Sequence, residues 1–284
     1  MNVRQVRKKT KSVSNVKKIT RSMQLVSAIK MKKSQQAAIE ARPYQQELEL
    51  VIKKVMTKMD VVKSPLLTTH APDTNPDLVV VLTGNKGLCG SFNIDLFRYI
   101  AGNIDMHNSK FITIGKKGAQ FISKTGGDIL ADYSHTAPLN NVSAVIKFAL
   151  ETFLKGTYKR VFVLYNSFIS TLKTEAVLAQ ILPYKLQLEQ KIEEKEYIEY
   201  VIEPSPNVII EQILRSFVEE KIRNAIIQSE AGEHSARMIA MKNATDNAND
   251  VIYNLTLLGN KLRQEKITSE LLDMITAKES VEAG

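Results

Sequence analysis

The sequence is poor in the residues that build disulfides, metal sites and membrane spans. It holds one cysteine, Cys89, and four scattered histidines, so it has neither a disulfide framework nor the spacing of metal ligands. The longest apolar run, Leu78–Leu82, is too short to cross a bilayer, and the charged start lacks the apolar segment of a secretory signal. We therefore expect no structural metal, no bound cofactor and no direct membrane insertion.

Acidic residues and helix breakers are missing from the start of the chain. Residues 1–33 hold eleven Lys or Arg and no Asp or Glu, so they carry the whole excess of the +9 net charge. All eight prolines lie between Pro43 and Pro206, and the first glycine is Gly84. This absence predicts one long helix over 2–42. Apolar residues recur along it in steps of three and four and form one stripe: Val13, Val16, Ile19, Met23, Val26 and Ile29.

Proline is also missing after Pro206, where only Gly232 and Gly259 interrupt a second helical pattern. One heptad series in it is apolar at seven of eight positions: Met241, Ala244, Ala248, Val251, Leu255, Leu258, Leu262 and Glu265. This period predicts a left-handed coiled coil, although amphipathic packing on a globular core is an alternative. The final turns, with Ile267, Leu271, Leu272 and Ile275, need another protein around them.

The middle of the chain alternates short strands with helices. Strands are predicted at 78–83, 111–115, 129–133 and 160–166, and helices at 93–103, 116–124 and 142–155. Closing strands are possible at 176–181 and 197–202. The alternation predicts a parallel sheet. The fold class is therefore α/β: a long antiparallel coiled coil of the terminal helices (1–60 and 207–284) plus a central Rossmann-like domain (77–203).

A glycine-rich turn, Gly84–Gly90, follows the first predicted strand. Its spacing matches neither the dinucleotide fingerprint nor a P-loop, so a tight strand-to-helix turn is the simpler interpretation. Cys89 within it is expected to be a small buried hydrophobe rather than a nucleophile. Two alternative functions stay open from the residues alone: a freestanding nucleotide-binding enzyme, and a basic nucleic-acid-binding coiled coil. The second is weakened because no aromatic residue precedes Tyr44 to stack on bases.

Four motifs resemble the gamma subunit of the rotary F-type ATP synthase. Residues 19–28 read ITRSMQLVSA, residues 86–90 read KGLCG, residues 234–248 read HSARMIAMKNATDNA, and residues 267–273 read ITSELLD. The resemblance covers nearly the whole chain. Three departures from the family pattern are visible: Asn85-Lys86 in place of Asp-Arg, Ser91 in place of Gly, and Ala277-Lys278 in place of Gly-Ala. Replacing a helix-stopping Gly by Ala predicts a longer final helix.

The resemblance implies a non-catalytic rotor shaft that couples ion flow across a membrane to ATP synthesis or hydrolysis on beta subunits. Its implied partners are a hexamer of alpha and beta subunits around the coiled coil, an epsilon subunit and a membrane c-ring, with no nucleic acid. The implied location is the cell membrane, peripherally, on the cytoplasmic side.

The resemblance also implies six residues for rotor coupling and beta-subunit contact. Met23 lies in the first motif. Arg237, Thr268 and Glu270 lie at motif positions that the family uses in coupling, and Arg263 with Gln264 at the contact with a beta-subunit catch loop. An ordinary solvated helix residue is the alternative for each of them. Arg has the strongest physical case, because its planar head holds carboxylates in fixed geometry.

Overall fold

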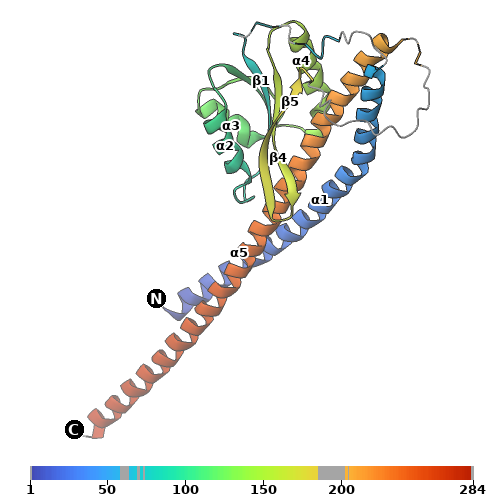
Figure 1. Ribbon diagram of the computed structural model, residues 1–284. Coiled ribbons are helices and arrows are strands. Elements are labelled where there is room, and N and C mark those ends of the chain that lie inside the picture. The colour runs from blue at the N-terminus through green and yellow to red at the C-terminus, as the bar shows by residue number, and fades with distance from the viewer. Residues whose placement is uncertain are drawn as a thin grey trace. The chain divides into compact units, whose positions relative to one another are not determined.

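The computed structural model describes residues 2–57, 64–68, 71–72, 74–184, 202–203 and 205–282. The chain forms two compact units. Unit 1 comprises Met1–Ser27 with Arg237–Gly284, and unit 2 comprises Ala28–Ala236. Two long helices, α1 (Val3–Thr57) and α5 (Pro206–Glu282), each contribute to both units (Figure 1).

Unit 2 holds a five-stranded sheet in the order β3-β2-β1-β4-β5. The strands are β1 (Asp77–Leu82), β2 (Ser109–Ile114), β3 (Asp128–Asp132), β4 (Val161–Ser170) and β5 (Lys173–Leu182). The helices between them are α2 (Phe92–Asn103), α3 (Lys116–Lys124) and α4 (Val142–Leu154), with a short 3-10 turn at Pro138–Asn141. This confirms the predicted order of strands and helices through β4.

The closing strand proposed at 176–181 is confirmed as β5, and it departs from the parallel direction predicted for the sheet. Strands β1 to β4 run parallel, but β5 pairs antiparallel with β4, from Val161 opposite Leu182 to Ser170 opposite Lys173. Only Thr171 and Leu172 separate the two strands, and a two-residue connection can join only antiparallel neighbours. The other proposed closing strand, 197–202, lies outside the described residues except for Ile202, which is not in a strand.

Both faces of the sheet are covered, which explains why β1 is apolar at successive positions. Leu78, Val80 and Leu82 belong to the core shared with α4, α1 and α5, whereas Val79 and Val81 belong to the core shared with α2 and α3 (Figure 1). The larger core includes Ile52 and Val55 of α1 and Ile210, Leu214 and Phe217 of α5.

Helix α1 begins with a capping box and does not stop at Pro43. The Asn2 side chain accepts a hydrogen bond from the Gln5 amide at 2.9 Å, and the Gln5 side chain accepts one from the Asn2 amide at 3.1 Å. A proline inside a helix costs about 3 kcal/mol. Burial of Ile52 and Val55 beyond it recovers roughly 1.5–3 kcal/mol for each side chain, so packing carries the helix on to Thr57. The end predicted at residue 42 is wrong for this reason, and α1 ends instead within the 1–60 range given for the first terminal helix.

Candidate functional site

In unit 1, α1 and α5 pair antiparallel through a seam of mostly small or polar side chains. Thr20 Oγ1 lies 2.8 Å from Thr245 Oγ1, and a Cβ on Gly259 would lie 3.4 Å from Val6 Cγ1. Val6 near the start of α1 meets Gly259, and Thr20 further along α1 meets Thr245, which precedes Gly259 in α5. The two helices therefore run antiparallel. Among the described side chains of unit 1, the buried hydrophobic ones are few: Val6, Met241 and Ala248.

The outer surface of unit 1 carries most of its large apolar side chains. They are between 38% and 65% exposed: Val16, Ile19, Leu25, Val26, Val251, Tyr253, Leu257, Leu258, Ile267, Leu271, Leu272, Met274 and Ile275. The stripe predicted on α1 is therefore mainly an outward-facing surface. A soluble monomer rarely exposes so many large apolar side chains along its helices, and such surfaces mark interaction sites.

The six residues implied by the resemblance fall into two sets. Arg237 is buried, with 7% exposure, and Met23 is half-buried. The other four, Arg263, Gln264, Thr268 and Glu270, are exposed on one stretch of α5. The structure thus brings four of the six together on an accessible surface.

Two of these exposed residues make local contacts within α5. The Thr268 hydroxyl donates to the Gln264 carbonyl at 3.0 Å, and Glu270 pairs with Lys266 at 3.3 Å. An exposed pair four residues apart contributes only a few tenths of a kcal/mol. Neither contact would strongly oppose binding of these side chains to a partner.

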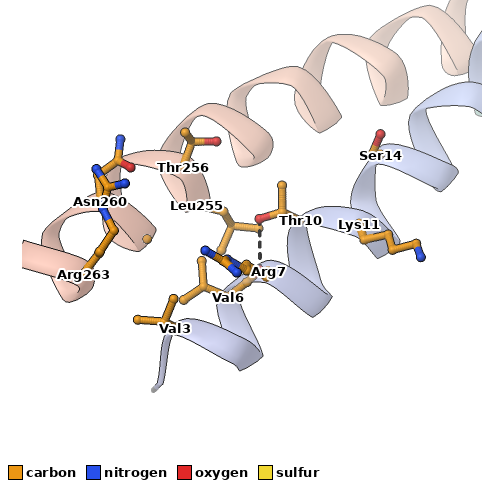
Figure 2. Close-up of a pocket in the computed structure, with 11 residues that line it drawn as sticks. Val3, Val6, Arg7, Thr10, Lys11, Ser14, Leu255, Thr256, Asn260 and Arg263 are labelled. Carbon is orange, nitrogen blue, oxygen red and sulfur yellow. Dashed lines mark hydrogen bonds between the residues drawn. The ribbon is translucent and has the colours of Figure 1, made fainter. Parts of the chain in front are cut away.

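A groove between α1 and α5 was not foreseen from the sequence. It has a volume of about 430 Å³ and is lined by Val3, Val6, Arg7, Thr10, Lys11, Ser14, Leu255, Thr256, Gly259, Asn260 and Arg263 (Figure 2). The groove lies between Arg263 of α5, which the resemblance implies as a functional residue, and Arg7 and Lys11 of α1. The resemblance implies no role for Arg7 or Lys11. The available signal was Gly259, because a glycine within a helical pattern often marks a close approach or a missing side chain.

The carboxyl end of the sheet, where nucleotides bind in Rossmann folds, is closed by the chain's own groups. The Gly84 amide donates to Asn93 Oδ1 at 3.0 Å, the Lys116 amide to Asn85 Oδ1 at 2.9 Å, and the Gly118 amide to Thr83 Oγ1 at 2.8 Å. These side chains take up backbone donors that a phosphate would otherwise use.

A carboxylate also lies against this turn. A Cβ on Gly84 would lie only 3.0–3.2 Å from the carboxylate atoms of Glu233 on α5. A negative charge beside the turn opposes a second anion there. The geometry therefore disfavours the interpretation of the chain as a nucleotide-binding enzyme.

Cys89 is buried in a polar contact. The Asn93 side-chain amide donates to its sulfur at 3.3 Å. No group of three or more His, Cys, Asp or Glu that could hold a metal ion occurs among the described residues. In that same part of the chain, no helix is both long and apolar enough to cross a membrane.

Comparison with known proteins identifies the family. The ATP synthase family model matches residues 2–281. The ATP synthase gamma chain of Akkermansia muciniphila is 34% identical over 292 aligned residues, and that of Pelotomaculum thermopropionicum 33% over 285, each match covering 99% of both chains.

Solved structures share the fold. A chain of the Euglena gracilis mitochondrial ATP synthase, in an OSCP/F1/c-ring structure, gives a TM-score of 0.69 at 17% identity and covers 99% of this chain and 95% of its own. A chain of the Tetrahymena thermophila central stalk and c-ring gives 0.57 at 20% identity, covering 80% and 99%. The sequence matches over the full length show that this chain belongs to the ATP synthase gamma chain family.

Proposed function

We propose that this chain is the central rotor shaft of an F-type ATP synthase and that it makes and breaks no bond itself. The observation that carries this proposal is the outward-facing apolar surface of unit 1, on both α1 and α5. A pair of helices that buries few apolar side chains and exposes many requires a surrounding protein to cover them. Alpha and beta subunits around the shaft, with an epsilon subunit and a c-ring, are the partners that fit a gamma chain.

The shaft works by differential contact. Its two helices present different side chains around their circumference, so rotation changes which residues meet each beta subunit. A contact that stabilises one conformation of a subunit more than another shifts the affinity of its distant nucleotide site. We propose that this coupling acts through six residues: Met23, Arg237, Arg263, Gln264, Thr268 and Glu270. The closed carboxyl end of the sheet supports a non-catalytic role.

The proposed location is the membrane surface, on the cytoplasmic side, through the assembly rather than through an anchor of this chain. Purification of the tagged chain from its native membrane tests the function. We expect alpha and beta subunits to co-migrate with it in an assembly that hydrolyses ATP. Recovery of the chain without them would refute the proposal.

A matched pair of variants tests the apolar surface directly. Changing Ile267, Leu271 and Ile275 together to Ser should lower recovery of alpha and beta subunits, because these side chains are half-exposed and lose contacts only in the assembly. The control changes three exposed polar residues of the same helix, Asn249, Asp250 and Asn254, to Ser. Equal recovery of both variants would show that the apolar surface is not the binding surface.

A further inference from the structure

Within unit 2, helix α5 meets strands β4 and β5 through small and polar residues (Figure 1). The Ser167 hydroxyl donates to Gln228 Oε1 at 3.0 Å, and the Ser235 hydroxyl donates to the Thr171 carbonyl at 2.5 Å. Between these two contacts, a Cβ on Gly232 would lie only 3.0 Å from a side chain of β5. Positions 228, 232 and 235 lie four and three residues apart, so they share one face of the helix. This face of α5 is closely fitted to the sheet.

The next residue along α5, Glu233, lies against the turn that follows β1. A Cβ on Gly84 would lie 3.0 Å from Cδ of Glu233, 3.1 Å from Oε2 and 3.2 Å from Oε1. The carbon and both oxygens are almost equally distant, so the carboxylate group, rather than its stem, lies against the glycine. The φ of Gly84 is not in the left-handed region, so the backbone itself does not require glycine there. The missing side chain at Gly84 therefore makes room for the carboxylate.

Gly84 lies at the topological switch point of the sheet. From β1 the chain adds β2 and β3 on one side, and then returns to place β4 on the other side of β1. In open α/β sheets, ligands bind in the crevice outside the carboxyl ends of the strands at this point. Two helix N-termini also meet Gly84: its amide donates to Asn93 of α2 at 3.0 Å, and its carbonyl accepts from the Lys117 amide of α3 at 3.3 Å. Helix N-termini carry partial positive charge, so the Glu233 carboxylate lies where this topology favours an anion.

The charged side chains of these two helices are also compatible with a carboxylate at Gly84. Helix α3 begins with Lys116 and Lys117 and has no acidic residue in its first turn. The acidic residue in the first turn of α2 is Asp95, which forms an ion pair with Arg98 at 3.3 Å. The first turns of α2 and α3 therefore favour a negative charge between them.

We propose that Glu233 is a positioning residue, whose carboxylate acts as an internal ligand of the switch-point crevice and fixes the setting of α5 on the sheet. Apolar packing is non-directional and tolerates a rotation of the helix about its own axis. A carboxylate held between two helix N-termini has one favourable position, so it selects one rotation. On the proposed function, the contact makes the sheet and this part of α5 turn together, and that consequence alone rests on the proposed function.

The first test compares hydrogen exchange of the full-length chain with that of its Glu233→Ala variant. The reporters are the Gly84 amide, which donates to Asn93, and the Lys117 amide, which donates to the Gly84 carbonyl. Loss of a carboxylate at helix N-termini weakens this turn, so both amides should exchange roughly fivefold faster in the variant. Exchange within about twofold of wild type would overturn the proposal.

A neighbouring carboxylate on the same helix provides the matched control. Glu230 lies three residues before Glu233, and its carboxyl interacts electrostatically with Lys30 and Lys33 of α1 as well as with Glu233. Glu230→Ala removes the same atoms and the same charge as Glu233→Ala. It should change the exchange of the turn amides by less than about twofold. Equal acceleration by both variants would show a general effect of charge on α5 and overturn the proposal.

Rescue by a free carboxylate separates an anion site from simple packing. Acetate has the shape of the group that Glu233→Ala removes. Added acetate should return the turn amides of this variant to within about twofold of wild type, whereas chloride at the same ionic strength should not. Wild type and Glu230→Ala should not respond to acetate. Fast exchange in Glu233→Ala that acetate leaves unchanged would show that the side chain acts by packing alone.

A double-mutant cycle tests why position 84 is glycine. Gly84→Ala adds a methyl group that meets the Glu233 carboxylate, so the Lys117 amide should exchange faster. The same methyl group should add nothing in the Glu233→Ala background, because its space is then free. Gly87→Ala is the control, since a Cβ there meets nothing within 4 Å. A double variant whose acceleration is the product of the two single effects would refute the contact.

The consequence for coupling is measured in the assembled enzyme. Glu233→Ala should lower ATP-driven ion pumping per ATP hydrolysed about twofold relative to Glu230→Ala, and an equal ratio would refute this consequence. The exchange measurements need no other subunit, so their outcome is independent of whether alpha and beta subunits co-purify. A chain that shows acetate rescue but recovers no subunits would disprove the proposed function alone. A chain that recovers the subunits but keeps its turn protected in Glu233→Ala would disprove the positioning proposal alone.

Discussion

The hydroxyl pair Thr20–Thr245 should behave as one coupled unit in the seam. The two Oγ1 atoms lie 2.8 Å apart, at 8% and 5% exposure, and each hydroxyl also has a carbonyl acceptor on its own helix: Met241 at 2.8 Å from Thr245 and Lys17 at 3.1 Å from Thr20. Since each hydroxyl has one proton, one of the two donates across the helix pair and the other donates to its own carbonyl. Thr20→Val or Thr245→Val alone leaves the remaining hydroxyl buried without its partner across the helix pair. Loss of such a bond costs about 1 kcal/mol, whereas replacing both partners by apolar groups of similar shape is nearly neutral.

Hydrogen exchange of the full-length chain measures this, because it reports local opening in each unit separately. A loss of about 1 kcal/mol makes amides of α1 around residue 20 exchange roughly fivefold faster in either single variant. The double variant should return to within about twofold of wild type. Thr10→Val is the control, since the Thr10 hydroxyl donates only to the Val6 carbonyl of its own helix, at 3.0 Å.

The refuting result is additivity. If the double variant exchanges about 25-fold faster, the product of the two single effects, the hydroxyls act independently and the cross-helix bond is absent. A coupled result would instead identify Thr20–Thr245 as a polar pair that favours one register of the two helices, as single polar positions do in other coiled coils.

Three further predictions concern unit 2. Burial raises the pKa of the Glu230 carboxyl, and the charge of Glu233 raises it further. The folded chain therefore binds this proton more tightly than the unfolded chain, and its stability falls as the pH rises from about 4.5 through the raised pKa. Glu230→Gln should therefore raise the thermal midpoint at neutral pH but not at acid pH, and an equal shift at both would contradict this. Burial, with the Glu49 charge, raises the pKa of Tyr184 to about 12, so stability present below pH 10 falls as pH climbs from 10 towards 12. Tyr184→Phe should flatten that fall in alkaline urea titrations, whereas an unchanged slope would place the effect elsewhere. Gly115→Ala should unfold or severely destabilise the chain, because the φ of Gly115 is +118° and a Cβ there would lie 2.0 Å from the Thr83 carbonyl oxygen. The control Gly87→Ala places its Cβ in open space and should leave the thermal midpoint unchanged.

Local patterns were sufficient for most of unit 2. The helix at 116–124 has the predicted bounds, and strands β1 to β3 lie within two residues of theirs, because apolar runs and glycines mark these elements directly. The direction of β5 was not predicted, because alternation of strands and helices predicts only parallel neighbours. The connection through Thr171 and Leu172 contains no glycine, so it gives no hairpin signal.

The ends of the long helices show where tertiary packing overrides local signals. Pro43 is a strong stop signal, yet α1 continues to Thr57 on the strength of contacts with distant strands that no local pattern contains. At the other end, Ala277 is a helix-favouring residue, and α5 runs past it to Glu282. Helix propensity therefore agrees with the exposed end of α5 at Glu282, whereas burial in the core determines where α1 ends at Thr57.

The seam shows why periodicity alone could not locate the functional surface. Of the predicted heptad series, Met241 and Ala248 are buried and Leu255 and Leu262 half-buried, but Val251 and Leu258 are exposed. Their places in the seam are taken by their neighbours Ile252 and Gly259, while Thr245, next to Ala244, is buried in the seam.

A hydrophobic template assigns the most apolar residues to the inside, which is correct for a helix pair that stands alone in water. In this chain small or polar residues such as Thr245 and Gly259 let the two helices approach closely, and the heptad residues Val251 and Leu258 face outward. This partial reversal is a reason for inferring a surrounding protein, because part of the surface that hydropathy assigns to the core of the coiled coil is left exposed for a partner.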